Sequence, residues 1–165
     1  MEGGANMKVD DPPRQAPVRV AHIASWVRSI GGVETLLARH AEQDARRGLE
    51  ATQLSLFDRP PHGGEREKDY VPLRFNWKSF PWLMRRKISS ELAQLARAVT
   101  VWHGGWGLPW FADRDHSSRR IVCLWDGPQD FRSWLPHVRP WLDGVISMSQ
   151  SATDAAQNML PDWPR

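Results

Sequence analysis

The chain has 165 residues, of which 41% are hydrophobic and 25% charged; this composition fits one globular domain and excludes a wholly disordered chain. The formal net charge of +3 favours acidic partners but is too small for the dense cationic face of a nucleic-acid-binding protein. Cys123 is the only cysteine, which rules out an internal disulfide and indicates a buried thiol. With no apolar stretch near the roughly 18 residues of a spanning helix and no signal peptide, we expect a cytoplasmic protein.

The first elements in chain order are a leader, a strand, a glycine turn and a helix. Residues 1–17 combine glycine, proline and scattered charge without an apolar period, so we expect a disordered leader. Val18–Ser25 predicts a short apolar strand, and Gly31 and Gly32 follow it closely. Apolar residues then recur at helical spacing from Val33 to Gly48, where glycine is a natural helix stop.

The glycine turn indicates an anion site. Paired glycines let the backbone approach a ligand closely, and the helix start behind Gly31 and Gly32 offers free N–H groups and a positive dipole end. A diphosphate-facing turn is one interpretation, and a merely tight strand-to-helix turn is the alternative. Neither the dinucleotide fingerprint G-x-G-x-x-G nor the phosphate loop G-x-x-x-x-G-K-[ST] occurs, so the substrate is not specified.

The rest of the chain alternates predicted strands with predicted helices. The strands are Ala51–Phe57, Tyr70–Phe75, Val99–His103, Arg120–Trp125 and Gly144–Met148. The helices are Phe80–Ala98, Phe131–Leu142 with interruptions at Pro136 and Pro140, and Ala152–Leu160 with Ser151 as its N-cap. This alternation predicts a Rossmann-like α/β fold, a parallel sheet with helices on both faces.

Ligands of such sheets bind beyond the carboxyl ends of the strands. Besides the glycine turn, the polar and aromatic residues predicted at that edge are Ser25, His103, Trp125, Asp126 and Ser149. His103 either contacts a substrate through an uncharged imidazole or is a satisfied histidine at the rim of the sheet. Asp126 either binds an acceptor or caps the loop that follows it.

The chain contains ten tryptophans but one tyrosine. Trp106 lies beside glycine, where a large amphipathic ring suits a ligand cleft, an interface or a membrane surface. The segment 76–87 joins aromatic side chains to cations, a composition typical of a segment attracted to anionic lipid. Its candidate membrane contacts are Trp77, Trp82, Arg85, Arg86 and Lys87. A solvated basic turn before a core helix is the alternative.

Two kinds of catalytic site are disfavoured by spacing. The histidines show neither H-x-x-x-H nor H-E-x-x-H spacing, and one cysteine cannot build a zinc cluster, so we expect no metal site. No G-x-S-x-G elbow occurs, which disfavours a serine hydrolase.

Four short motifs follow one another between residues 18 and 160. They are Ile30-Gly-Gly-Val-Glu34, Val101-Trp-His-Gly-Gly105, Leu124-Trp-Asp-Gly127 and Asp143-Gly-Val-Ile-Ser-Met-Ser149. In this order they resemble the N-terminal half of GT-B glycosyltransferases, specifically the retaining family-four enzymes such as bacterial polysaccharide and lipopolysaccharide sugar transferases. One position departs from the family pattern: Trp125 stands where the family has histidine, while Asp126 remains.

The resemblance implies a glycosyltransferase of the hexosyltransferase type. In this family the N-terminal half binds mainly the acceptor, a second Rossmann-like half binds the nucleotide sugar, and no metal cofactor is needed. The acceptor would be a glycan or a lipid-linked sugar in cell-envelope or exopolysaccharide biosynthesis. The implied site residues are His103 and Asp126 for catalysis, Gly31 and Gly32 facing the donor diphosphate, and Trp106, Trp125 and Ser149 for the acceptor.

The resemblance also sets an expectation for the domain organisation. Residues 18–160 would form the N-terminal domain, and residues 161–165 fall where the family's interdomain linker begins. We therefore expect the reading frame to continue into a second half, and the 165-residue chain alone to be inactive. Because family members often act on lipid-linked acceptors, peripheral contact with the inner face of the membrane is expected as well.

Two other functions compete with sugar transfer. A non-catalytic, flavodoxin-like nucleotide-binding module could use the same strand-end edge for binding alone. Nucleic-acid binding through tryptophan and arginine is weaker, because the basic residues are dispersed along the chain.

Overall fold

The computed structural model describes residues 17–25, 27, 32–58, 69–75, 81–95, 99–104, 119–125 and 128–162. These residues contain a six-stranded sheet with the order β3-β2-β1-β4-β5-β6. The strands are β1 (Arg19–Ala24), β2 (Glu50–Ser55), β3 (Tyr70–Pro72), β4 (Val99–His103), β5 (Arg119–Leu124) and β6 (Gly144–Ser147). Every neighbouring pair is parallel, which confirms the predicted Rossmann-like α/β class.

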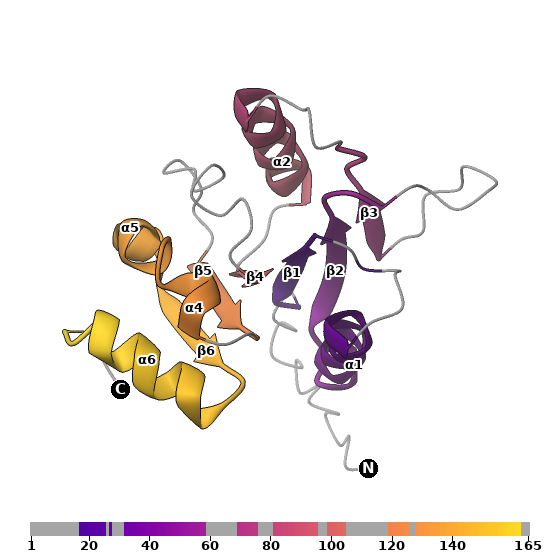
Figure 1. Ribbon diagram of the computed structural model, residues 1–165. Coiled ribbons are helices and arrows are strands. Elements are labelled where there is room, and N and C mark those ends of the chain that lie inside the picture. Colours follow the sequence, from indigo (N-terminus) through magenta and orange to yellow (C-terminus); the bar gives the residue numbers. More distant parts are fainter. Residues whose placement is uncertain are drawn as a thin grey trace, which may run out of the picture.

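Helices lie on both sides of the sheet. They are α1 (Gly32–Arg46), α2 (Pro81–Leu95), α4 (Pro128–Phe131), α5 (Leu135–Val138) and α6 (Gln150–Met159), with the 3₁₀ helix η1 at Arg139–Trp141. Figure 1 shows α1 and α2 on opposite sides of the strands, with α4, α5 and α6 gathered beside β5 and β6.

Each face of the sheet has its own apolar core, because successive strand residues point to opposite faces. The larger core joins strand residues to α2, α4, α5 and α6; its members include Ala21, Ile23, Trp102, Val122, Met84, Ile88, Phe131, Leu135 and Ala152. On the α1 face, Leu37 of α1 packs with Ala24 and Tyr70. A second small cluster on that face consists of Val20, Val101 and Cys123.

The predicted end of the first helix is confirmed. The helix α1 ends at Arg46, and Gly48 adopts a left-handed φ of 79°. The N–H of Gly48 donates to the carbonyl of Ala45, and the N–H of Leu49 donates to the carbonyl of Asp44, each over 3.0 Å. A residue with a β-carbon would be strained at this φ, so glycine is required there.

The predicted strand Tyr70–Phe75 is too long. The strand β3 stops at Pro72, and Arg74 has a left-handed φ of 59°, which turns the chain out of the extended conformation. Two further backbone bonds, from Leu73 to Ser55 and from Phe75 to Leu56, still tie this segment to the chain around the end of β2.

The prediction of one interrupted helix over Phe131–Leu142 is wrong. Two short helices, α4 and α5, and the 3₁₀ helix η1 replace it. Proline stands in the first turn of both α5 and η1, where its missing N–H costs no hydrogen bond, so Pro136 and Pro140 open new helices.

The predicted N-cap Ser151 is also wrong. The cap of α6 is Ser149, whose Oγ accepts a hydrogen bond from the N–H of Ala152 over 3.2 Å. The helix therefore begins at Gln150, and Ser151 already belongs to its first turn.

Candidate functional site

The carboxyl ends of the strands form one edge, as the sequence predicts for parallel pairing. Ala24, the last residue of β1, is in register with His103, the last residue of β4. Trp125 directly follows β5, and Gly104 directly follows β4 with a left-handed φ of 83°. This edge carries the polar and aromatic groups described below, and we call it the strand-end edge.

Gly32 is the first residue of α1 and is exposed. A β-carbon built on it meets no atom within 4 Å, and its φ lies outside the left-handed region. Neither packing nor backbone conformation therefore requires glycine here. The N-terminus of a helix, with the N–H groups of its first turn and the positive end of its dipole, suits an anion, and Gly32 stands at this position in α1. Gly31 lies outside the described residues.

The segment between β1 and α1 is anchored by a buried carboxylate. Oδ2 of Asp58 accepts hydrogen bonds from the N–H of Val27 over 2.8 Å and from the hydroxyl of Tyr70 over 3.0 Å. The N–H of Asp58 in turn donates to Oγ of Ser55 over 3.0 Å. Asp58 thus ties the chain that leads into the glycine turn to the end of β2 and the start of β3.

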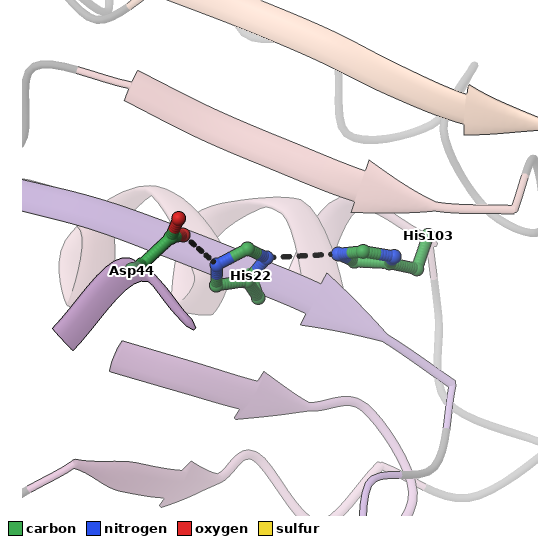
Figure 2. A network of polar contacts seen from close by, with 3 residues as sticks. All are labelled: His22, Asp44 and His103. Carbon is green, nitrogen blue, oxygen red and sulfur yellow. Dashed lines mark hydrogen bonds and ion pairs between the residues drawn. The ribbon is translucent and has the colours of Figure 1, made fainter. Parts of the chain in front are cut away.

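The central feature of the strand-end edge is a chain of hydrogen bonds that runs from the edge into the α1 face of the sheet. Nε1 of Trp125 lies 3.2 Å from Nδ1 of His103. Nε2 of His103 lies 2.9 Å from Nδ1 of His22, and Nε2 of His22 lies 2.9 Å from Oδ2 of Asp44 on α1 (Figure 2). We call these four residues the histidine network.

The proton positions in the histidine network follow from its two ends. The indole of Trp125 can only donate, so Nδ1 of His103 accepts and the proton of the neutral imidazole sits on Nε2. That proton is donated to Nδ1 of His22, which places the His22 proton on Nε2, facing the Asp44 carboxylate. All three bonds therefore run in one direction, from Trp125 to Asp44.

Both network histidines are neutral near pH 7. Burial lowers the pKa of His22 below its usual 6.5 and outweighs the opposing bond to Asp44. Burial, with smaller contributions from His22 and His40, lowers the pKa of His103 from 6.5 to about 3. The contact between His22 and Asp44 is thus a hydrogen bond to a carboxylate rather than an ion pair.

His40 completes the aromatic surroundings of the histidine network. Its ring, on α1, lies with its centroid 5.7 Å from Trp125 and 6.1 Å from His103. Both His40 and Trp125 are half-buried, whereas His22 and His103 are only 3% and 7% exposed. Within the histidine network and its aromatic surroundings, the side chains that a ligand at this edge can reach are consequently those of Trp125 and His40.

The donor pattern does not suit a metal ion. A metal ligand needs a free ring nitrogen, but both nitrogens of His22 and of His103 are engaged within the protein. Within the described ranges, no group of three or more His, Cys, Asp or Glu side chains is placed to hold a metal. Cys123 is buried as predicted, and burial raises the pKa of its thiol to about 12.

The structure places the remaining predicted site residues as follows. Ser149 is exposed and caps α6 at the strand-end edge. Asp126, Trp106 and Trp77 lie outside the described residues. His103 is at the edge as expected, with both of its ring nitrogens engaged by protein partners.

Four of the five side chains proposed for membrane contact belong to the first two turns of α2: Trp82, Arg85, Arg86 and Lys87. Trp82 is 63% exposed, and Arg85 and Arg86 are exposed as well. Lys87 differs, because its Nζ donates to the carbonyl of Leu73 and lies 5.5 Å from the centre of the Phe75 ring. Lys87 therefore has a role within the fold. No described helix combines the length and apolar character needed to cross a membrane.

Four residues around this edge were not predicted from the sequence: His22, His40, Asp44 and Asp58. One signal was available: His22 alternates with Val20 and Ala24 on one face of β1, where a parallel sheet is normally apolar. A second was the spacing of Leu37, His40 and Asp44, which places them along one side of a helix. Neither signal identifies the partner across the sheet.

Comparison with known proteins supports the fold. No family model matches the chain, and no curated protein does. The structure is similar to that of an alpha-glucosyltransferase solved in complex with UDP and a 13-mer DNA containing a central A:G mismatch, with a TM-score of 0.54 and 13% sequence identity. The match covers 80% of this chain and 37% of the glucosyltransferase. The chain therefore has a glycosyltransferase-like Rossmann fold and spans little more than a third of that neighbour.

Proposed function

We propose that this chain is one half of a glycosyltransferase that moves a hexose from a nucleotide-sugar donor to a glycan or lipid-linked acceptor in cell-envelope or exopolysaccharide biosynthesis. The observation that carries the proposal is the histidine network at the strand-end edge of a glycosyltransferase-like fold. Ligands of parallel α/β sheets bind at this edge. The bound UDP of the structural neighbour is consistent with a nucleotide-sugar donor.

The chemical contribution of the glycine turn would be stabilisation of the leaving group. Departure of a nucleoside diphosphate builds negative charge, and preorganised N–H groups at the start of α1 can stabilise that charge without a metal. Gly32 supports this role, because nothing packs where its side chain would be. The anchor from Asp58 to Val27 would hold the approach to this turn in place.

The acceptor side would consist of Trp125 and Ser149, with Trp106 and Asp126 as further candidates. An indole ring offers a flat apolar face for a pyranose ring. His103 remains in the proposed site as the residue that holds Trp125, because a direct bond to substrate would require one of its two hydrogen bonds to break.

A second, donor-binding half is part of the proposal. Closure of two halves excludes water and completes a transferase site. Ile146 in β6 and Met148 just beyond it are 44% and 41% exposed, which suits coverage by another domain at this end of the sheet. Peripheral contact of α2 with the inner face of the membrane is proposed from Trp82, Arg85 and Arg86.

The experiment is a transfer assay with a panel of UDP-, GDP- and dTDP-sugars, monitoring release of nucleoside diphosphate. The reading frame including any sequence downstream of Arg165 is compared with the 165-residue chain. The proposal is supported if the longer protein, but not the 165-residue chain, releases nucleoside diphosphate from one of these sugar nucleotides. Transfer by the 165-residue chain would overturn the two-half arrangement, and tight nucleotide binding without transfer by either protein would favour a nucleotide-binding module.

A further inference from the structure

We propose that Asp44 and His22 are positioning residues that fix the indole ring of Trp125, through His103, for stacking against a pyranose ring of the substrate. The stacking role rests on the proposed function, whereas the positioning role does not. Neither Asp44 nor His22 lies at the strand-end edge itself; they act from beneath it.

The histidine network has one consistent arrangement of protons. The indole at one end can only donate a hydrogen bond, and the carboxylate at the other end can only accept one. Two neutral imidazoles between them can therefore make all three hydrogen bonds in one arrangement of protons. Reversing either ring tautomer would set two donors or two acceptors against each other. The network therefore fixes which edge of each ring points toward its neighbour.

Both imidazoles of the histidine network are buried. His22 and His103 are 3% and 7% exposed, so water cannot replace a lost partner at little cost. The bonds link residues far apart in the chain: the sequence separation is 81 for His22 and His103, and 22 for His22 and Asp44. The network consequently couples α1, β1, β4 and the residue after β5 into one rigid unit.

Asp44 lies at an electrostatically unfavourable position. It lies in the last turn of α1, where the negative end of the helix dipole disfavours a carboxylate. Glu42, two residues earlier, is offset by its exposed ion pair with Arg46, whereas the side chain of Asp44 bonds to His22. A local cost of this kind indicates that the residue is held for its long-range contact.

The outer end of the histidine network is the indole ring of Trp125. Trp125 packs partly on the cluster of Val20, Val101 and Cys123, and His40 lies beside its ring. Its Nε1–H is already used by His103, so the polar handle of the indole is committed and the ring cannot turn freely. What remains for a ligand is an apolar aromatic surface at the strand-end edge, which suits the C–H groups of a sugar ring rather than a phosphate.

The positioning role is tested by long-range ¹H–¹⁵N NMR of the imidazoles in the labelled 165-residue chain near pH 7. We expect His22 and His103 each to be neutral with the proton on Nε2, and the Trp125 indole proton to show a hydrogen-bonded shift. Asp44→Ala should produce mixed tautomers at both histidines and move the indole signal. Asp44→Asn, which retains an acceptor oxygen, should restore the wild-type pattern.

The matched control is Glu42→Ala, which removes an exposed carboxylate from the same turn of α1. It should leave the imidazole and indole signals unchanged. A proton on Nδ1 of either histidine in the wild-type chain, or an unchanged Trp125 signal in folded Asp44→Ala, would overturn the positioning role.

The stacking role is tested in the longer protein with the nucleotide sugar and acceptor that the transfer assay identifies. Asp44→Ala should raise the acceptor KM about tenfold, equivalent to about 1.4 kcal/mol, with kcat and donor hydrolysis within about twofold of wild type. An unchanged acceptor KM with altered tautomers would refute stacking while leaving positioning intact. Absence of any transfer by the wild-type protein refutes the proposed function, and the NMR result still decides the positioning role.

Discussion

His22 and His103 face each other across two neighbouring parallel strands, with Nδ1 of one 2.9 Å from Nε2 of the other. The indole of Trp125 and the carboxylate of Asp44 close the two ends and set the direction of every bond between them. A strand that was expected to be plain apolar core thus carries a buried polar chain from α1 to the strand-end edge.

The first prediction concerns the pH dependence of stability. In the unfolded chain both histidines bind a proton below about pH 6.5, whereas folding lowers the pKa of His22 and lowers that of His103 to about 3. Between the lowered pKa values of the folded chain and about pH 6.5, the unfolded state therefore binds more protons than the folded state. The free energy of unfolding consequently falls as the pH falls below about 6.5. For His103 alone the loss is on the order of 2 kcal/mol by pH 5.

Urea unfolding between pH 4.5 and 8 measures this effect. The free energy of unfolding should be flat above about pH 7 and should decline toward pH 5, with a shallower decline in His103→Gln. His137 is exposed, so His137→Gln is the control and should follow the wild-type curve. Stability that rises on acidification would contradict neutral, buried network histidines.

The second prediction concerns the anchor at Asp58. Asp58→Ala leaves the N–H of Val27 and the hydroxyl of Tyr70 without this acceptor, in a site where Asp58 is only 8% exposed. We expect a loss of about 2 to 3 kcal/mol in the free energy of unfolding, against about 1 kcal/mol for Tyr70→Phe. Denaturant titration of both variants checks the order. A larger loss for Tyr70→Phe would show that Asp58 is not the centre of this anchor.

The third prediction separates two glycines. Gly104→Ala places a β-carbon on a residue with φ of 83° and should cost about 1 kcal/mol or more in stability. Gly32→Val meets open space at an ordinary φ, so the fold should survive. In the longer protein the side chain of Gly32→Val would occupy that open space and keep the diphosphate away from the N–H donors, so turnover should nevertheless fall at least about 100-fold, the scale of a lost anion-stabilising donor. Full turnover by a folded Gly32→Val variant would leave the turn with a structural role only.

The fourth prediction concerns α2 and anionic lipid. Replacing Arg85 and Arg86 together by alanine should reduce salt-sensitive co-sedimentation with phosphatidylglycerol vesicles, because both side chains are exposed beside Trp82. Lys87→Ala should instead lower thermal stability, because Lys87 contacts Leu73 and Phe75. Vesicle binding that is indifferent to lipid charge would refute the membrane role.

The fold was predictable from the sequence because its apolar runs alternate between strand-like and helical periods, and β4 even has the expected bounds Val99–His103. The errors have local causes: the left-handed φ of Arg74 ended a strand early, and Pro136 and Pro140 began new helices. These conformations depend on neighbouring contacts that periodicity does not record.

The candidate site was predictable only at the ends of strands. The position of His103 and Trp125 at the strand-end edge was predicted because a parallel sheet brings strand ends to one edge. Asp44 was not found, because its contact with His22 depends on how α1 crosses the sheet. The tautomers of His22 and His103 likewise follow from distances between residues that are remote in sequence.

Steady-state kinetics of Trp125→Ala in the longer protein test most directly the proposal that the strand-end edge of this chain receives the acceptor of a sugar transfer. We predict a raised acceptor KM with donor hydrolysis close to the wild-type rate, because the indole would contact only the acceptor. Equal losses of transfer and donor hydrolysis, or an unchanged acceptor KM, would contradict the account.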